Sequence, residues 1–451
     1  MSTVFGSIWW LIVSLGILVT FHEFGHYLVA RLCGVKVLRF SVGFGRPLWK
    51  RVGRDGTEYV VAMLPLGGYV KMLDEREVEV APHELPQAFT RKTVWQRFAI
   101  VAAGPAFNLV LCLALLWGMF VIGKNDYQPL VGRTQSLAAQ AGLALDDRIV
   151  AIDGERMDTW THAAMAITAG ALDRAPLDVE VLRANGDTRT LTLDLSRLDR
   201  KIDETTALRD IGIVPRQFLM APLVGPDIAG TPAQAAGLQP GDRIVAVGAQ
   251  PIQWWDEVGN AVQAQAAEGR PLRIDYTRDG QPGSVDIVPT LDRSESTPRW
   301  VLGIPNPKLQ AQYDALLRFG PIDAIGASLH ETWRLTGSTF GMLWRMVNGS
   351  ASLKNISGPI SIAQYANDSA QRGVAWFLWF LAILSLSLCI MNLLPIPILD
   401  GGHLLYYLIE MVKGSPVSER TLIAGQYLGI ALLAGLMGLA FYNDIARLVS
   451  S

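Results

Sequence analysis

Four long apolar stretches stand out along the chain, and polar segments separate them. They cover residues 5–32, 98–122, 376–394 and 422–441. A helix of about 20 residues crosses the hydrocarbon core of a bilayer, so each stretch is long enough to span a membrane. The pattern predicts a multi-pass α-helical membrane protein with four transmembrane helices.

A different pattern follows the first apolar stretch. Residues 38–45 and 58–63 are typical of β-strands, and Gly67-Gly68 is expected to break the chain before a further strand at 69–72. A small membrane-associated β-sheet is the predicted result. Its edge could pair with an extended substrate through backbone hydrogen bonds, or it could be a hairpin that caps the neighbouring site.

Between the second and third apolar stretches lies a segment of soluble character with an internal repeat. Residues 141–152 recur at 236–247, 95 residues later, and Trp160 matches Trp255 at the same spacing. Two copies of one β-rich domain are expected. The shared run Ala-Gly-Leu-x-x-x-Asp-x-Ile resembles a PDZ domain. This implies either a groove that accepts a strand or a chain end, or a filter that blocks bulky partners.

Polar and apolar residues mix over 313–348, which predicts amphipathic helices on the membrane surface, with Pro321 in the first turn of one. A turn is expected at 357–360. The chain then divides into five parts: the first two spans with the sheet (1–125), the two PDZ-like copies (126–220 and 221–309), surface helices with a linker (310–372), and the last two spans (373–451).

The charge pattern orients these spans. The net charge is -2, which argues against a nucleic-acid partner. Uncharged residues precede the first stretch, whereas Lys36, Arg39 and Arg46 follow it, so the N-terminus is expected outside and the next loop in the cytosol. Both termini and the repeat copies would then face the periplasm of a bacterium.

The end of the first apolar stretch carries the pattern His-Glu-x-x-His. On a helix, His22 and His26 lie one turn apart on one face and can bind one metal ion. Glu23 can then take a proton from a metal-bound water. Because ionisable groups are costly inside a membrane, their presence here favours a metal site over a chance pattern.

A third ligand is expected at the end of the third apolar stretch. Catalytic zinc takes three protein ligands and leaves one position for water. Pro395 and Pro397 stop the helix and force an extended stretch, which brings Asp400 level with the two histidines. His403 is the competing ligand, and Asp400 could instead cap the following helix.

Two amides near these motifs need partners. Asn108 lies in the second stretch, after Gly104-Pro105, and is expected to support the metal ligands or the packing. The Gly-Pro pair itself is expected to let another helix approach closely. Asn392 could donate hydrogen bonds to the substrate backbone or to a developing oxyanion, or it could be structural.

The motifs H-E-F-G-H, G-P-x-x-N and N-x-x-P-x-P-x-L-D-G, on the first three spans in order, resemble the site-2 protease family of intramembrane zinc metalloproteases. The resemblance implies one Zn²⁺ held by His22, His26 and Asp400, with Glu23 as general base. It implies a bacterial inner-membrane enzyme that acts in regulated intramembrane proteolysis during the envelope stress response.

The same resemblance implies the partners. These are the lipid bilayer and single-pass membrane proteins, such as a trimmed anti-sigma factor and remnant signal peptides. The PDZ pair would act as a size filter. The loop Gly43, Phe44 and Gly45, with the sheet beside it, would hold the substrate extended, and Pro395 and Pro397 are further candidates for substrate contact.

Two other functional classes are weaker. A PDZ scaffold with a structural zinc would use four protein ligands, whereas the motifs supply three. A metal transporter would need ionisable groups on several spans, but the second and fourth apolar stretches carry none.

Overall fold

A computed structural model describes residues 2–76, 78–198, 206–292, 298–305, 312–349, 353 and 356–450. The chain forms two compact units, one of residues 1–125 and 316–451 and one of residues 126–315. The five expected parts of the chain stay predictions, and residue 310, the expected start of the surface helices, lies outside the described residues.

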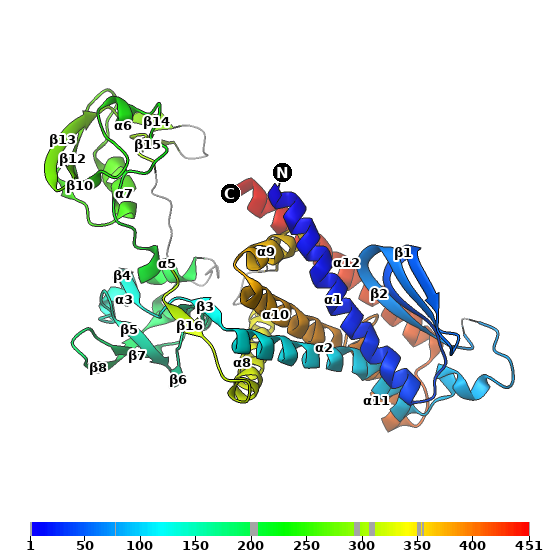
Figure 1. Cartoon of the computed structure of the whole chain (residues 1–451). Coiled ribbons are helices and arrows are strands. Elements are labelled where there is room, and N and C mark those ends of the chain that lie inside the picture. Colours follow the sequence, from blue (N-terminus) through cyan, green and yellow to red (C-terminus); the bar gives the residue numbers. More distant parts are fainter. Residues whose placement is uncertain are drawn as a thin grey trace. The chain divides into compact units, whose positions relative to one another are not determined.

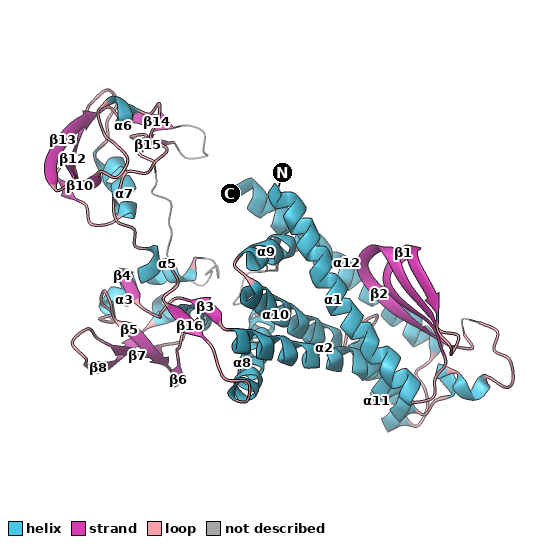
Figure 2. Cartoon of the chain, in the orientation of Figure 1, coloured by secondary structure: helices cyan, strands magenta, loops and turns pink. Residues whose placement is uncertain are grey.

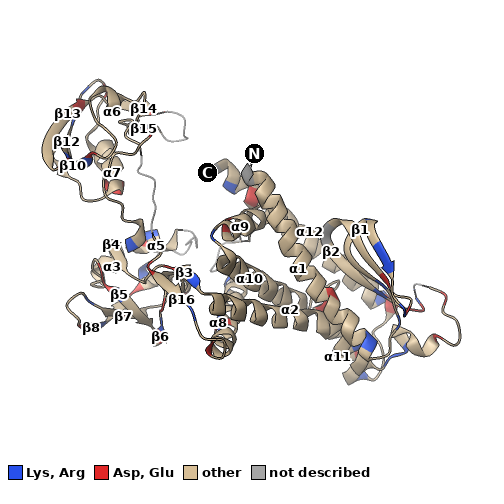
Figure 3. Ribbon diagram, in the orientation of Figure 1, with Lys and Arg blue, Asp and Glu red and all other residues tan. Residues whose placement is uncertain are grey.

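Among the described residues, four helices, all in the first unit, are long and apolar enough to cross a membrane, and they confirm the predicted spans (Figure 1). They are α1 (Ser2–Leu32), α2 (Val94–Ile122), α10 (Val374–Leu393) and α12 (Glu419–Ser450). Helix α2 begins before its apolar stretch because Thr93 and Gln96 form a capping box at its N-terminus. Figure 3 shows α10 without a Lys, Arg, Asp or Glu.

A curled antiparallel pair, β1 (Val37–Val52) and β2 (Glu58–Met72), follows α1. The two strands pair twice, since Phe40 of β1 lies opposite both Tyr59 and Val70 of β2. Two long strands therefore make a sheet four segments wide, which lies against α1 (Figure 2). The later half of β2 forms the side of this sheet that is next to α1.

Three expectations about local structure are wrong. Gly67-Gly68 do not end a strand, because Gly67 adopts φ 156 and lets β2 bend and continue. Residues 315–317 are strand β16 (Ala315–Leu317), paired with β3 (Lys124–Asp126), and not helix. Pro321 precedes the helix that it was expected to start, and its carbonyl oxygen accepts a hydrogen bond from the indole of Trp117.

Among the described residues, the first unit also contains α8 (Asp323–Val347), α9 (Pro359–Gln371), α11 (Asp400–Lys413) and the short 3-10 helices η1 (Leu85–Gln87) and η2 (Phe89–Arg91). Helix α8 packs on α2 and α9 packs on α1. The exposed face of α8 carries Trp333 and Trp344, as suits a helix at a membrane surface.

The second unit holds two four-stranded sheets of the same topology, with strand orders β6-β5-β7-β8 and β11-β10-β12-β13. The internal repeat of the sequence corresponds to these two sheets. In each copy, the repeated aspartate (Asp147 or Asp242) is almost fully buried and accepts a backbone N–H in the turn before the central strand.

The first copy contains β4 (Val131–Thr134), α3 (Ser136–Gln140), β5 (Arg148–Ile152), β6 (Glu155–Arg156), α4 (Trp160–Asp173), β7 (Leu177–Leu182), β8 (Thr188–Leu193), α5 (Ala207–Ile211) and β9 (Ile213–Pro215). The second contains α6 (Pro232–Ala235), β10 (Arg243–Val247), β11 (Gln250–Pro251), α7 (Trp255–Gln265), β12 (Leu272–Arg278), β13 (Gln281–Ile287), β14 (Thr290–Asp292) and β15 (Arg299–Val301).

Candidate metal centre

Three side chains from α1 and α11 converge inside the first unit. One ligand atom from each of His22, His26 and Asp400 lies within 4.8 Å of the others. The Oδ2 atom of Asp400 is 3.2 Å from Nε2 of His22 and 3.6 Å from Nε2 of His26, and the two Nε2 atoms are 3.2 Å apart. Two imidazoles and one carboxylate, which are usual ligands of zinc, therefore face one point.

Each imidazole is also held by its other ring nitrogen. Nδ1 of His26 lies 2.9 Å from the carbonyl oxygen of Ile100 on α2, so Nδ1–H donates there and Nε2 keeps its lone pair. Nδ1 of His22 lies 3.2 Å from the amide nitrogen of Asn108. The Asn108 Oδ1 atom is buried without a hydrogen-bond partner among the described residues, so a rotated amide would let Oδ1 accept the Nδ1–H of His22.

Helix α2 can approach the two imidazoles because it has a glycine at the contact. A Cβ atom at Gly104 would overlap the ring of His26 and would lie 2.8 Å from Cε1 of His22. Pro105 follows within the helix, where it removes one backbone hydrogen bond. On α1, a Cβ at Gly25 would overlap the backbone of Ala103. Both glycines therefore set the distance between α1 and α2 at the centre.

The extended stretch after α10 delivers Asp400. The chain turns sharply there, with Ile398 at φ 101, a strained conformation for a β-branched residue. A Cβ atom at Gly401 or Gly402 would overlap the backbone of residues 393–397, so the Asp-Gly-Gly sequence lets α11 start against that stretch. Asp400 is the first residue of α11, and the N-cap position is Leu399.

The electrostatics of the cluster favour an ionised carboxylate. Burial alone would raise the pKa of Asp400, but the imidazoles of His22 and His26 hold this pKa well below its usual range. A deprotonated carboxylate is the form that binds a metal ion. His403 lies outside the cluster and contacts the ring of Tyr406, and burial lowers the pKa of His403.

Glu23 lies between the cluster and the sheet. Its carboxylate interacts with the backbone of Val70 in β2, and a Cβ atom at Gly68 would lie 3.1 Å from Cγ of Glu23. The later half of β2 therefore runs beside both the cluster and a carboxylate suited to acid–base chemistry.

The remaining predicted site residues lie at three places around this centre. Asn108 is fully buried on α2, and its main-chain carbonyl oxygen accepts a hydrogen bond from the hydroxyl of Ser385 on α10. Asn392 is partly buried near the end of α10, and Pro395 and Pro397 lie in the extended stretch beyond it.

Phe44, in the bend of β1 between Gly43 and Gly45, stacks on Tyr69 of β2 with ring centroids 6.2 Å apart. Both glycines have positive φ, 94° and 90°, which makes this bend possible. Phe44 of the predicted substrate loop thus contacts β2, the strand that runs past Glu23.

This chain is similar to known proteins along most of its length. Residues 10–436 match the model of peptidase family M50. The chain belongs to this family. A relative in Xylella fastidiosa (strain 9a5c) named "Putative zinc metalloprotease" is 51% identical over 446 residues, covering 99% of this chain and all of the relative.

Two further relatives of this chain carry a more specific name. "Protease RseP" of Yersinia pestis is 42% identical over 455 residues, covering 99% of this chain and all of the relative. "Regulator of sigma-E protease RseP" of Escherichia coli (strain K12) is 40% identical over 442 residues, covering 97% of this chain and 98% of the relative. The family predicted from the three motifs is confirmed, and so is the enzyme class, a metalloprotease.

Gly104 was expected to let another helix approach closely, and its position against the imidazoles of α1 agrees with this. The close contacts of Gly25, Gly402 and Gly429 were not predicted from the sequence. Gly429 on α12 lies against the carbonyl of Pro397, where a Cβ atom would overlap it. The spacing of small residues along α12 (Gly425 and Gly429) is the signal that could have indicated a close approach.

Proposed function

We propose that this chain is an intramembrane zinc metalloprotease in which His22, His26 and Asp400 hold the zinc ion. The observation that carries the proposal is the convergence of their three ligand atoms within 4.8 Å. The buried Oδ2 of Asp400, which has no hydrogen-bond partner among the described residues, fits a metal ligand. The zinc in the names of relatives agrees with this donor set.

Glu23 is the general base of the proposed mechanism. When bound, zinc supplies Lewis-acid chemistry for peptide hydrolysis. Glu23 takes a proton from the attacking water and later returns one to the leaving amine. Asn108 and the Ile100 carbonyl orient the two imidazoles so that each Nε2 faces Asp400, where the three side chains would hold the ion. In this proposal Asn392 donates a hydrogen bond to the substrate backbone.

The substrates are transmembrane segments of single-pass membrane proteins. A helix in a membrane satisfies its own backbone, so its peptide bonds are accessible only after it unwinds. The edge of β2 beside Glu23 offers backbone donors and acceptors that replace those lost bonds. Phe44 and Tyr69 lie on the same sheet and hold the extended segment.

The physiological substrates are a pre-trimmed anti-sigma factor and remnant signal peptides. The relatives named as regulators of sigma-E support this assignment. It places the enzyme in the bacterial inner membrane and in the envelope stress response. Both termini and the repeat unit face the periplasm, as the basic residues after α1 favour, and the metal centre lies towards the cytosol.

The two repeat copies are PDZ-like domains. They either accept an extended segment in a groove or exclude substrates that still carry a bulky external domain. A shared strand order and a shared buried aspartate support a common fold for the two copies.

The test compares the purified wild type in detergent with Glu23→Gln, using a tagged single-pass substrate and measuring zinc on the same samples. We expect cleavage by the wild type alone, with one zinc ion per chain in both. Zinc in both samples without cleavage of any trimmed single-pass substrate would instead favour a membrane scaffold with a structural metal.

A further inference from the structure

The second repeat copy has a groove between α7 and β15. Its volume is about 450 Å³, and its walls include the apolar side chains of Val258, Val262 and Ile304. Strand β15 pairs on one side with β14, where Trp300 lies opposite Leu291. The other edge of β15 faces α7 across the groove.

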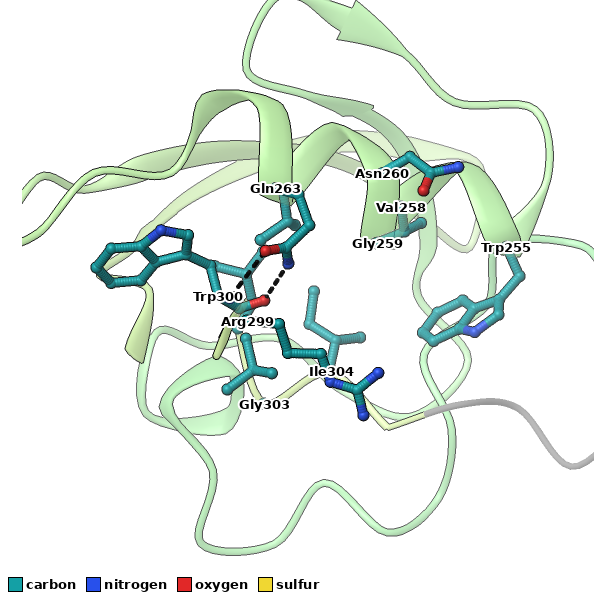
Figure 4. Close-up of a pocket in the computed structure, with 12 residues that line it drawn as sticks. Trp255, Val258, Gly259, Asn260, Gln263, Arg299, Trp300, Gly303 and Ile304 are labelled. Atoms are coloured by element: carbon teal, nitrogen blue, oxygen red, sulfur yellow. Dashed lines mark hydrogen bonds between the residues drawn. The ribbon is translucent and has the colours of Figure 1, made fainter. Parts of the chain in front are cut away.

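The side chain of Gln263 on α7 covers this edge (Figure 4). Its Nε2 donates to the carbonyl oxygen of Trp300 at 2.6 Å, and its Oε1 accepts the N–H of Trp300 at 3.0 Å. A residue in a neighbouring antiparallel strand makes this same reciprocal pair of bonds. The carboxamide therefore stands in for the peptide groups of a strand added to β15.

We propose that Gln263 is a built-in competitor that caps the groove of the second copy. To bind, an extended peptide segment with an apolar side chain has to displace the carboxamide and make the same two bonds to Trp300. This inference rests on the proposed function of the repeat copies, in its strand-accepting form.

The exposure of Gln263 suits a cap that can leave. Gln263 is an exposed residue, so its freed carboxamide would be hydrated at once. Two neutral hydrogen bonds at an exposed position hold a side chain only loosely. The cap therefore lowers the affinity for an extended peptide by about tenfold and does not prevent binding.

The first copy differs at the corresponding place. In the second copy, β15 precedes Gly303, which has a positive φ. In the first copy, the corresponding Gly212 also has a positive φ, but the segment before it is helix α5 and not a strand. Ala207 and Ile211 of α5 are fully buried, and α5 packs on α4. Among the described residues, the strand edge with a glutamine cap is thus a feature of the second copy.

Helix α7 also supplies a matched control. Gln265 makes the same kind of bonds, from its Nε2 to the Val247 carbonyl and from the Ala249 N–H to its Oε1, but away from the groove. In the full chain, Gln263→Ala and Gln265→Ala therefore each remove one carboxamide and its two hydrogen bonds to backbone groups from the same helix. Gln263→Glu, which keeps the length and the acceptor but loses the donor, is a second way to open the cap.

Two measurements on detergent-purified protein test the proposal. Hydrogen exchange at the Trp300 amide should be about tenfold faster in Gln263→Ala than in the wild type or in Gln265→Ala. A fluorescein-labelled pentapeptide, Ala-Ala-Leu-Ala-Ala, should bind about tenfold tighter to Gln263→Ala and Gln263→Glu. Zinc content should stay unchanged in all three variants, since the metal centre lies in the other unit.

Unchanged exchange at Trp300 in Gln263→Ala would overturn the cap. Faster exchange without tighter peptide binding would overturn the competition, and would leave the repeat copies as a filter. Loss of cleavage in Glu23→Gln tests the protease separately, so failure of this inference does not touch the metal centre.

Discussion

The two units of the chain distribute polar and apolar groups in opposite ways. In the first unit, only 11% and 6% of the most apolar 18-residue stretches of α1 and α12 are buried, so these helices expose most of their apolar surface. The polar groups of the metal centre, by contrast, converge inside this unit. In the second, side chains such as Ile149 and Ile244 are fully buried. A bilayer supplies the apolar contacts of the first unit, so its internal polar residues serve function more than stability.

This contrast has a testable consequence. Substitutions at the centre of the first unit should remove activity and leave the fold intact. Substitutions at buried polar groups of the second unit should weaken the fold and leave the chemistry intact.

The largest effect is expected for Asp400→Ala. Loss of one of three ligands should lower cleavage by at least roughly 10³-fold, because several kcal/mol of metal-dependent transition-state stabilisation is lost. Zinc per chain and cleavage of a single-pass substrate would be measured together, with circular dichroism for the fold. Asp368→Ala, at an exposed position on α9, is the control. Full zinc and full activity in Asp400→Ala would place the centre elsewhere.

Gly104→Ala should reduce cleavage by about 10²-fold, since its new methyl group would push the imidazoles out of position by roughly 1 Å. Gly118→Ala on the same helix is the matched control, because its Cβ would meet Leu378 at an ordinary 3.6 Å. Equal activities of the two variants would mean that α2 does not hold the ligands in place.

Asn108→Ala should weaken zinc binding by about 10- to 100-fold, because the Nδ1 of His22 loses its partner. Competition with a chelator measures this affinity. Asn443→Ala is the control, since Asn443 is also buried but bonds to the carbonyl oxygens of Leu353 and Ile356. If both variants lost zinc alike, general loosening of the membrane unit would explain the result.

Asp242→Asn should leave zinc and cleavage unchanged and should destabilise the second repeat copy by about 1–3 kcal/mol. The carboxylate is almost fully buried and accepts hydrogen bonds from Arg278 at 2.7 Å. Thermal unfolding and hydrogen exchange over β10 and β12 measure the change. Asp275→Asn, which breaks a more exposed pair with Arg273, should cost less.

Asp242 should also make the second repeat copy less stable at acid pH. Burial alone would raise the pKa of Asp242, but hydrogen bonds from Arg278 and from the Gln239 N–H hold it below its ordinary value. Because the folded pKa lies below the unfolded one, the stabilisation is full above about pH 4 and is lost as the pH falls through the folded pKa. A stability curve for Asp242→Asn that kept the full acid slope would contradict this assignment.

Much of the architecture could be predicted because it follows from local patterns. Four runs of about 20 apolar residues identify the spans, whatever their neighbours are. The spacing of His22, Glu23 and His26 places two imidazoles on one helix face, since the helical period is a local property. The repeat at a spacing of 95 residues indicates two copies before any contact is known.

Contacts between distant segments were decided by the tertiary structure. The double pairing of β1 with β2, and the passage of β2 through Gly67-Gly68, depend on the curl of the whole sheet. The role of Gly104 depends on how near α2 comes to α1, and the cap at Trp300 depends on a helix that lies more than 30 residues away.

The sequence by itself therefore determined which segments are long and apolar enough to cross a membrane, which residues are candidate metal ligands and which segment is repeated. These features follow from composition and period within one segment. The tertiary structure alone decided which backbone lies against which side chain. The physical reason is that close packing and hydrogen bonding act between atoms a few ångströms apart in space, at any distance along the chain.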